Sequence, residues 1–133
     1  MADLASLVLR VVVGAIFLGQ GHTKLFRPPD EPQGRERLAA AIAAAGFPFA
    51  ARLALLVAAV EAFFGTLLLL GFQTRLATVP LTALLVVAIA RVRWQKGFVN
   101  GWDWPLSVLG GTIALLLLGS GAYSLDALLG LPW

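Results

Sequence analysis

Apolar residues in this chain occur in four long, nearly unbroken runs that are separated by shorter polar segments. The runs cover about residues 4–21, 52–70, 76–92 and 105–118. A helix rises about 1.5 Å per residue, so about 20 apolar residues cross the hydrocarbon core of a bilayer. Such runs differ from the one-sided apolar stripe of a soluble helix. The pattern predicts an all-α fold, a four-helix transmembrane bundle that forms a single membrane domain over residues 1–133.

The polar segments predict how the four helices are connected. Residues 24–48 are rich in Pro, Gly and charged side chains, and the alanines within 35–45 favour a short helix. We expect an interfacial or re-entrant helix there, between the first and second spans. Residues 71–75 form a much shorter link, so the second and third spans should be antiparallel neighbours. Pro105 suits the first turn of the fourth span.

Composition narrows the class of protein further. Hydrophobic residues make up 59% of the chain and charged residues 13%, whereas about a quarter of the residues in a soluble domain are charged. The net charge is +3, and the basic residues lie beside apolar runs, so lipid headgroups explain them better than nucleic acid does. A nucleic-acid partner is therefore excluded. The sequence has no cysteine, so this chain alone cannot form an iron–sulfur cluster or a thiolate metal site.

The basic residues also predict how the protein is oriented in the membrane. Four spans put both termini on one side, and most Lys and Arg residues flank the two longer loops on the other side. The residues concerned are Lys24, Arg27, Arg35, Arg37, Arg52, Arg91, Arg93 and Lys96. Because Lys and Arg concentrate in cytoplasmic loops, we expect the longer loops in the cytoplasm and the termini outside.

Two charged residues, Arg10 and Glu61, lie well away from the ends of the predicted spans. A carboxylate near the middle of a membrane is costly, so it should face the bundle interior and have a partner. If Leu4 and Gly71 mark the same membrane surface, the depths of Arg10 and Glu61 differ by only about 6 Å. We therefore expect a structural ion pair between them. The alternative is that Glu61 accepts protons or binds a ligand.

A second polar group is expected where the first span ends and the fourth begins. His22 and Asp103 would form a proton-transfer pair there, lined by tryptophan, as a quinone headgroup requires; the alternative is that both are simply solvated. His22 is the only histidine, so one chain cannot supply a bis-histidine haem or an all-histidine metal site, and no metal site is expected. The catalytic candidates are Glu61, Asp103 and His22, and the ligand-binding candidates are Arg10, Gln20, Lys24, Glu61, Trp102 and Asp103.

Several short motifs follow one another along nearly the whole chain in a recognisable order. They are Arg10 with Gly21-His22-Thr23-Lys24, then Gly46-Phe47-Pro48, Glu61 with Gly65, Gly71 with Thr74-Arg75, Asn100-Gly101-Trp102-Asp103-Trp104-Pro105, and Gly119-Ser120-Gly121-Ala122-Tyr123-Ser124-Leu125-Asp126. In order and spacing these motifs resemble the DoxX family of small bacterial and archaeal membrane proteins. The chain departs from the family pattern at Gln20 and Arg93, where many members have histidine, and at Asp103, where glutamate is usual.

The resemblance implies a multi-pass protein of the bacterial or archaeal plasma membrane that is linked to redox chemistry. Family members are described as related to the membrane subunit of thiosulfate:quinone oxidoreductase, or as partners of oxidative-stress enzymes. The leading hypothesis is therefore a membrane subunit of a quinone-linked oxidoreductase or oxidative-stress redox complex, with a quinone as the possible cofactor and no haem or iron–sulfur cluster. No side chain is redox-active, so a soluble redox enzyme or another subunit must supply the electrons.

Two other functions are compatible with the sequence. One is a non-catalytic membrane scaffold or anchor for a soluble enzyme, in which residues 24–48 carry the binding surface. The other is a small-molecule carrier that uses Arg10 and Glu61 near the membrane midplane. Since four spans are few for transport, the carrier requires a homo-oligomer. Apart from the lipid bilayer, the expected partners are thus further copies of this chain or the subunits of a hetero-complex.

Overall fold

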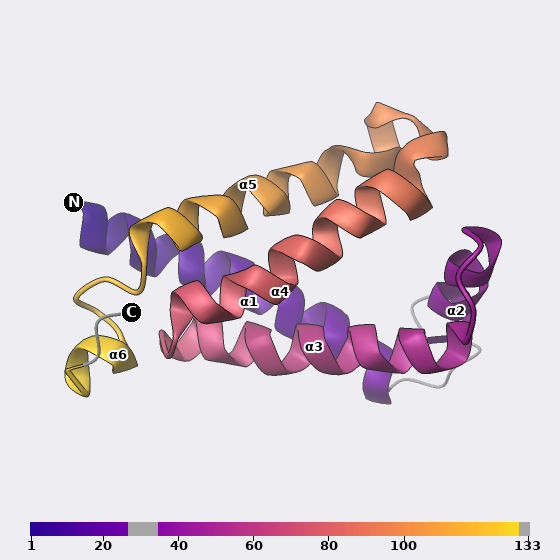
Figure 1. The fold of residues 1–133 in the computed structure, drawn as a ribbon. Coiled ribbons are helices and arrows are strands. Elements are labelled where there is room, and N and C mark those ends of the chain that lie inside the picture. Colours follow the sequence, from indigo (N-terminus) through magenta and orange to yellow (C-terminus); the bar gives the residue numbers. More distant parts are fainter. Residues whose placement is uncertain (27–34, 131–133) are drawn as a thin grey trace.

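The computed structural model describes residues 1–26 and 35–130, and these form helices joined by turns (Figure 1). The helices are α1 (Ala2–Phe26), α2 (Arg35–Ala44), α3 (Ala50–Leu70), α4 (Thr74–Val87), a π-helical turn (Ala88–Arg93), a 3-10 turn (Trp94–Lys96), a second π-helical turn (Phe98–Trp102), α5 (Asp103–Leu118) and α6 (Leu125–Leu128). Four helical stretches are long and apolar enough to cross a membrane: Ala2–Phe26, Ala50–Leu70, Thr74–Lys96 and Phe98–Leu118. The fold is therefore the all-α four-span architecture predicted from the apolar runs.

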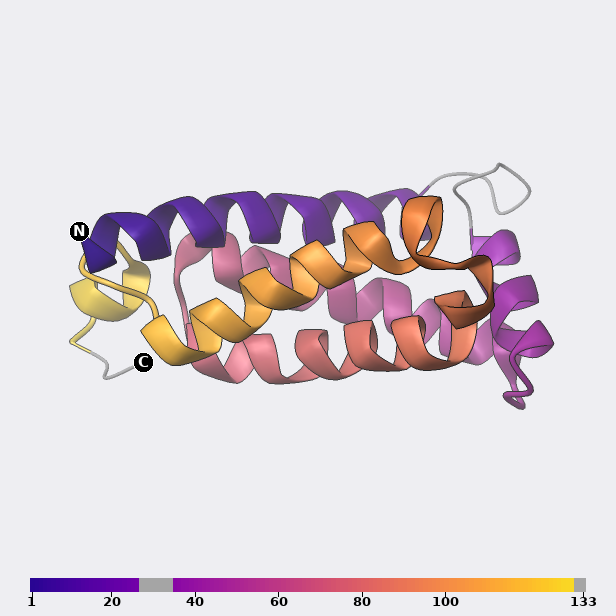
Figure 2. The same ribbon diagram turned by 90° about the horizontal axis from the view of Figure 1, so that it is seen from above.

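The spans form an antiparallel bundle in which α1 packs along α3, α3 along α4, and α4 along α5 (Figures 1 and 2). Both described ends of the chain lie at one end of the bundle, which we call the terminal end. The opposite end, called the loop end, carries α2 and the connection between α4 and α5. The short helix expected between the first two spans is α2, and it ends at Ala44.

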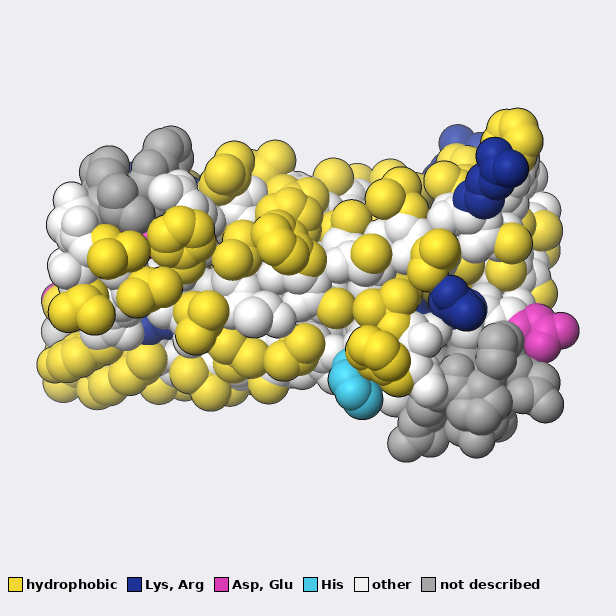
Figure 3. All heavy atoms as spheres, turned by 90° about the horizontal axis from the view of Figure 1, so that it is seen from below, with side chains coloured by type: hydrophobic (Ala, Val, Ile, Leu, Met, Phe, Trp, Pro, Cys, Tyr) yellow, Lys and Arg dark blue, Asp and Glu magenta, His cyan; other side chains and the backbone are white. Residues whose placement is uncertain are grey.

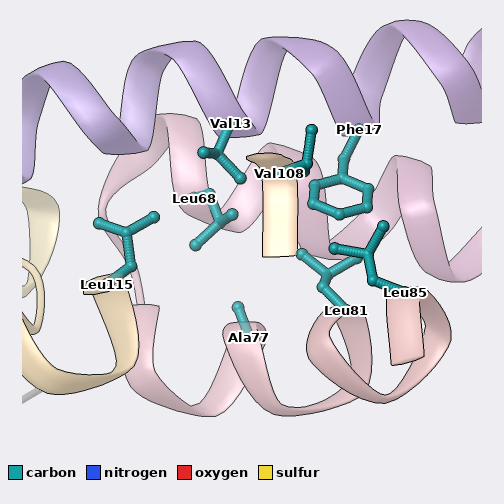
Figure 4. Packing of buried hydrophobic residues seen from close by; sticks show 8 residues of the cluster. All are labelled: Val13, Phe17, Leu68, Ala77, Leu81, Leu85, Val108 and Leu115. Carbon is teal, nitrogen blue, oxygen red and sulfur yellow. The ribbon is translucent and has the colours of Figure 1, made fainter. Parts of the chain in front are cut away.

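Large apolar side chains from all four spans fill the centre of the bundle (Figure 4). The buried cluster consists of Val13, Phe17, Leu68, Ala77, Leu81, Leu85, Val108 and Leu115. Many other Leu, Val and Phe side chains are exposed, and they cover the middle of the face seen in Figure 3. Lipid tails are as apolar as these side chains, so close packing and hydrogen bonds hold the helices together more than the hydrophobic effect does.

Helices α1 and α3 approach each other closely because small residues lie where they cross. A Cβ atom on Gly21 would lie 2.5 Å from the backbone nitrogen of Ala62, and one on Gly65 would lie 2.7 Å from the backbone nitrogen of Leu18. Glycine at these positions removes the side chain that would otherwise separate the two backbones. The contact fixes the register of the two helices, with Gly21 opposite the turn of α3 that contains Ala58 and Ala62.

The α4–α5 connection, residues 88–104, is named the tip. The helix of α4 widens into π-helical geometry over Ala88–Arg93 and tightens into a 3-10 turn that ends at Gly97, whose φ is 78°. The ring of Trp94 stacks on that of Trp102, with centroids 5.2 Å apart and planes 15° apart. This stack joins the two helical stretches that meet at Gly97. These stretches, Thr74–Lys96 and Phe98–Leu118, extend beyond the apolar runs at 76–92 and 105–118.

Candidate functional site

Among the described residues, the ionisable side chains inside the bundle and their partners form two separate groups, one near each end. The terminal cluster consists of Arg10, Thr74, Ser120 and Asp126, all of them buried. The loop-side pair consists of Lys24 and Glu61, which are partly exposed. The terminal cluster is sealed from solvent, whereas the side chains of the loop-side pair remain accessible.

Arg10 is 1% exposed and is held mainly by backbone carbonyls. Its guanidinium donates to the carbonyl oxygens of Leu68 and Leu69 at 3.3 and 3.4 Å, and to that of Tyr123. The first two carbonyls belong to the last turn of α3, which no further helical turn follows, and that of Leu68 also accepts from the backbone N–H of Gly71 at 3.1 Å. Arg10 therefore caps α3 and at the same time holds the C-terminal segment of the chain.

Asp126 completes the terminal cluster from the C-terminal segment. Its carboxylate accepts a hydrogen bond from the backbone N–H of Gln73 at 2.9 Å and another from the hydroxyl of Ser120. The hydroxyls of Ser120 and Thr74 are hydrogen-bonded at 2.7 Å. Asp126 also interacts electrostatically with the guanidinium of Arg10. The cluster thus joins α1, the α3–α4 turn and the C-terminal segment, which is a structural role.

The predicted ion pair between Arg10 and Glu61 is wrong, because Glu61 pairs with Lys24 instead. The prediction placed Gly71 at the depth of Leu4, but Gly71 lies directly against Arg10 in the structure. Glu61 precedes Gly71 by ten residues and so lies about 15 Å further along the bundle than Arg10. The C-terminal segment, which the depth estimate ignored, occupies the space beyond Gly71.

The loop-side pair links α1 and α3 within the half of the bundle nearer the loop end. The Nζ atom of Lys24 lies 2.8 Å from Oε2 of Glu61, and the side chains are 16% and 12% exposed. Gly21 faces the turn of α3 that contains Glu61, and Lys24 follows Gly21 by one turn of helix. Helical side chains lean toward the N-terminus, so Lys24 reaches back to the level of Glu61. The pair presents both a cation and a carboxylate without being sealed inside the bundle.

Within the described residues, the remaining predicted site residues form no hydrogen bond or ion pair with Lys24 or Glu61. Gln20 and His22 are exposed on α1, and the ring of His22 packs against Phe26 with centroids 4.8 Å apart. Trp102 and Asp103 belong to the tip, where the Asp103 carboxylate accepts backbone N–H bonds from Asn100 and Trp104. The end of α1 and the start of α5 diverge at the loop end (Figure 1). The expected pairing of His22 with Asp103 is therefore absent from the described part of the chain.

The sequence reasoning missed three residues of the terminal cluster, namely Thr74, Ser120 and Asp126. The first two are small hydroxyl residues that belong to the motifs listed above, but nothing in those motifs marks them as buried. Asp126 belongs to the closing motif that resembles the DoxX family, and this order of residues was the available signal. Within residues 1–26 and 35–130, no three His, Cys, Asp or Glu side chains are grouped so that they could hold a metal ion.

The fold and the two polar groups define a small four-span helical membrane protein with a structural polar cluster at one end and a partly exposed ion pair toward the other. The DoxX family matches the chain over residues 5–94, so the protein belongs to the DoxX family.

Two curated relatives match most of the chain. A Mycobacterium tuberculosis protein described as an uncharacterized membrane protein is 36% identical over 132 residues, covering 89% of this chain and 77% of the relative. A Bacillus subtilis protein named "Putative oxidoreductase CatD" is 30% identical over 124 residues, covering 93% of this chain and 86% of the relative. No solved structure matches the chain.

Proposed function

We propose that this protein is the membrane subunit of a quinone-linked oxidoreductase and that the loop-side pair contacts the quinone headgroup. The observation that carries the proposal is the position of Lys24 and Glu61, an ion pair that lies within the spans yet remains partly exposed. Ionisable residues inside spans are functional candidates by default. The terminal cluster already accounts for Arg10 structurally, so the loop-side pair is the group left for chemistry. The name of the relative CatD supports the oxidoreductase class.

The two side chains suit the chemistry of a quinone headgroup. The ammonium of Lys24 would donate a hydrogen bond to one quinone carbonyl oxygen, and Glu61 would pass one proton to that oxygen, while the other carbonyl oxygen would take its proton from water at the exposed side of the pair. Reduction of a quinone to a quinol consumes two electrons and two protons. The sequence contains no cysteine, so the electrons would come from a redox-active partner subunit or substrate, and this chain would supply the binding site and a proton path.

The proposal predicts that a quinone co-purifies with the protein and depends on Glu61. We would purify the full chain in mild detergent, extract bound small molecules and identify them by mass spectrometry. Glu61→Gln removes a charged hydrogen-bonding group and should lower quinone occupancy by about tenfold or more. Glu36→Gln is the matched control, because Glu36 is exposed on α2 and its replacement should leave occupancy unchanged. Absence of quinone from the wild type, or equal occupancy in Glu61→Gln, would contradict the proposal.

A membrane anchor for a soluble enzyme is the second candidate function. The observation that favours it is α2, which lies at the loop end outside the packed spans and exposes Glu36 and Arg37 (Figure 2). This role predicts that only structural lipid is found in both the wild type and Glu61→Gln. The carrier hypothesis needed Arg10 and Glu61 in one midplane site, and the structure separates them.

We also propose that the loop end faces the cytoplasm and the terminal end faces outward. Most Lys and Arg side chains visible in Figure 3 lie toward the end opposite the termini, as the rule for cytoplasmic loops requires. Reporter tags fused at the two termini should lie outside the cell, whereas a tag inserted between residues 27 and 34 should lie in the cytoplasm. A tag in that loop that is accessible from outside the cell would reverse the proposed orientation.

A further inference from the structure

Three arginines at the loop end lie over aromatic rings. The guanidinium carbon of Arg93 is 4.9 Å from the ring centroid of Trp104, that of Arg91 is 5.2 Å from Phe47, and that of Arg52 is 5.7 Å from Phe49. A ring that covers the flat face of a guanidinium fixes its orientation but leaves the N–H groups on its edge free to donate. Each arginine is thus positioned without losing its ability to bind an anion.

Among the described residues, no acidic side chain forms an ion pair with the cations of the tip, and the one acid of the tip, Asp103, accepts backbone N–H bonds from Asn100 and Trp104. Residues 62–102 contain no Asp or Glu, although Arg91, Arg93 and Lys96 all belong to this stretch. Within the described residues, the ion pair that the chain forms is that of Lys24 with Glu61, which belong to α1 and α3 and not to the tip. Arg93 donates to the carbonyl oxygen of Gly101 at 3.2 Å, so it also helps to hold the tip together. Arg91 and Lys96 are exposed, and their charges face outward.

The same segment exposes large apolar side chains. Trp94 is 59% exposed, Phe98 51% and Val99 72%. An ordinary aqueous loop would be polar, whereas tryptophan beside Lys and Arg is typical of the boundary between headgroups and acyl chains. The tip therefore combines an apolar surface suited to the acyl boundary with unpaired positive charge suited to phosphate.

We propose that the tip is a binding site for the headgroup of an anionic phospholipid. Arg91 and Lys96 bind the lipid phosphate, Arg93 holds the backbone of the tip in place, and Trp94 and Phe98 lie against the upper acyl chain. Arg91 suits this role because a guanidinium can bind phosphate through two parallel hydrogen bonds. The site is independent of the loop-side pair and of any quinone bound there.

Contact between lipid and the tip can be measured through tryptophan fluorescence. The chain has four tryptophans, and Trp94, Trp102 and Trp104 all belong to the tip. In the full-length Trp133→Phe protein, intrinsic fluorescence therefore reports the tip alone. We would reconstitute this protein into phosphatidylcholine vesicles that contain brominated phosphatidylglycerol or brominated phosphatidylcholine at equal mole fraction. Bromine near the headgroup quenches a tryptophan only on close contact, so the ratio of the two quenching levels measures the preference for anionic lipid.

The expected result is stronger quenching by phosphatidylglycerol, with a preference that falls about fivefold for each cation removed in Arg91→Gln and Lys96→Gln. Arg91→Lys should keep most of the preference. Arg75→Gln is the matched control, because Arg75 is bound to the carbonyl of Leu117 near the other end of the bundle and its loss should not change the ratio. Equal quenching by the two lipids in the unmutated tip would overturn the proposal, whether or not the variants fold.

Discussion

Replacement of Arg10 by leucine is expected to destabilise the bundle by about 3–5 kcal/mol, the largest loss that we predict for one substitution in this chain. The guanidinium donates to three carbonyl oxygens and balances the charge of buried Asp126. Its removal takes one donor from each of these carbonyls in a low dielectric, where an unsatisfied acceptor costs more than at a surface; the carbonyl of Leu68 keeps its bond from the N–H of Gly71. Loss of helical circular dichroism on heating in detergent would measure the change.

Two further variants separate this mechanism from a general loss of charge. Arg37→Leu removes an exposed arginine from α2 and should leave the unfolding temperature nearly unchanged. The double variant Arg10→Leu with Asp126→Leu removes both charges, so it should lose less stability than the sum of the two single variants. If Arg10→Leu unfolds at the same temperature as Arg37→Leu, the terminal cluster does not stabilise the fold as described.

The second large effect is expected from Gly21→Ala, at about 2–3 kcal/mol. The added Cβ would lie 2.5 Å from the backbone nitrogen of Ala62 and 2.7 Å from the carbonyl oxygen of Ala58. Neither atom can rotate away as a side chain could, so α1 and α3 must separate. The same heating experiment measures the loss of stability.

Gly19→Ala provides a control on the same helix. A Cβ at Gly19 would meet nothing within 4 Å, and alanine favours helix more than glycine does, so this variant should be neutral or slightly stabilised. Separation of α1 and α3 would also draw Lys24 away from Glu61, and quinone occupancy should then fall in Gly21→Ala but not in Gly19→Ala. Equal stability of the two variants would show that the helices do not pack in the register described.

The number of spans, and the pairing of the second span with the third, could be predicted from the sequence because the bilayer imposes one strict requirement on each span. Each span must satisfy its backbone hydrogen bonds internally and present apolar side chains to lipid, so run length and composition identify it. The link at 71–75 is short enough to allow only an antiparallel turn, and the structure has that turn between α3 and α4. Alanine content likewise indicated the helix α2.

The partners of the charged residues did not follow from the sequence. Pairing depends on the register of two helices, and a shift of ten residues moves a side chain by about 15 Å. That register is fixed by the contacts of Gly21 and Gly65, which only the folded bundle reveals. Arg10 was expected to pair with Glu61, but its guanidinium is held by backbone carbonyls and lies in the field of Asp126, which belongs to a segment that folds back over the terminal end. No local pattern predicts this return.

The terminal cluster also orders the events of synthesis. Arg10 and Tyr123 are separated by 113 residues, so a ribosome adds Tyr123 about 6–23 seconds after Arg10, and the contact between them cannot form earlier. Two further contacts, Ser6 with the carbonyl of Gly119 and Asp3 with the N–H of Ala122, join the same two parts of the chain. Helix α1 thus acquires these hydrogen-bond partners only after the C-terminal segment has been made, so the terminal end of the bundle closes later than the contact between α1 and α3 can form.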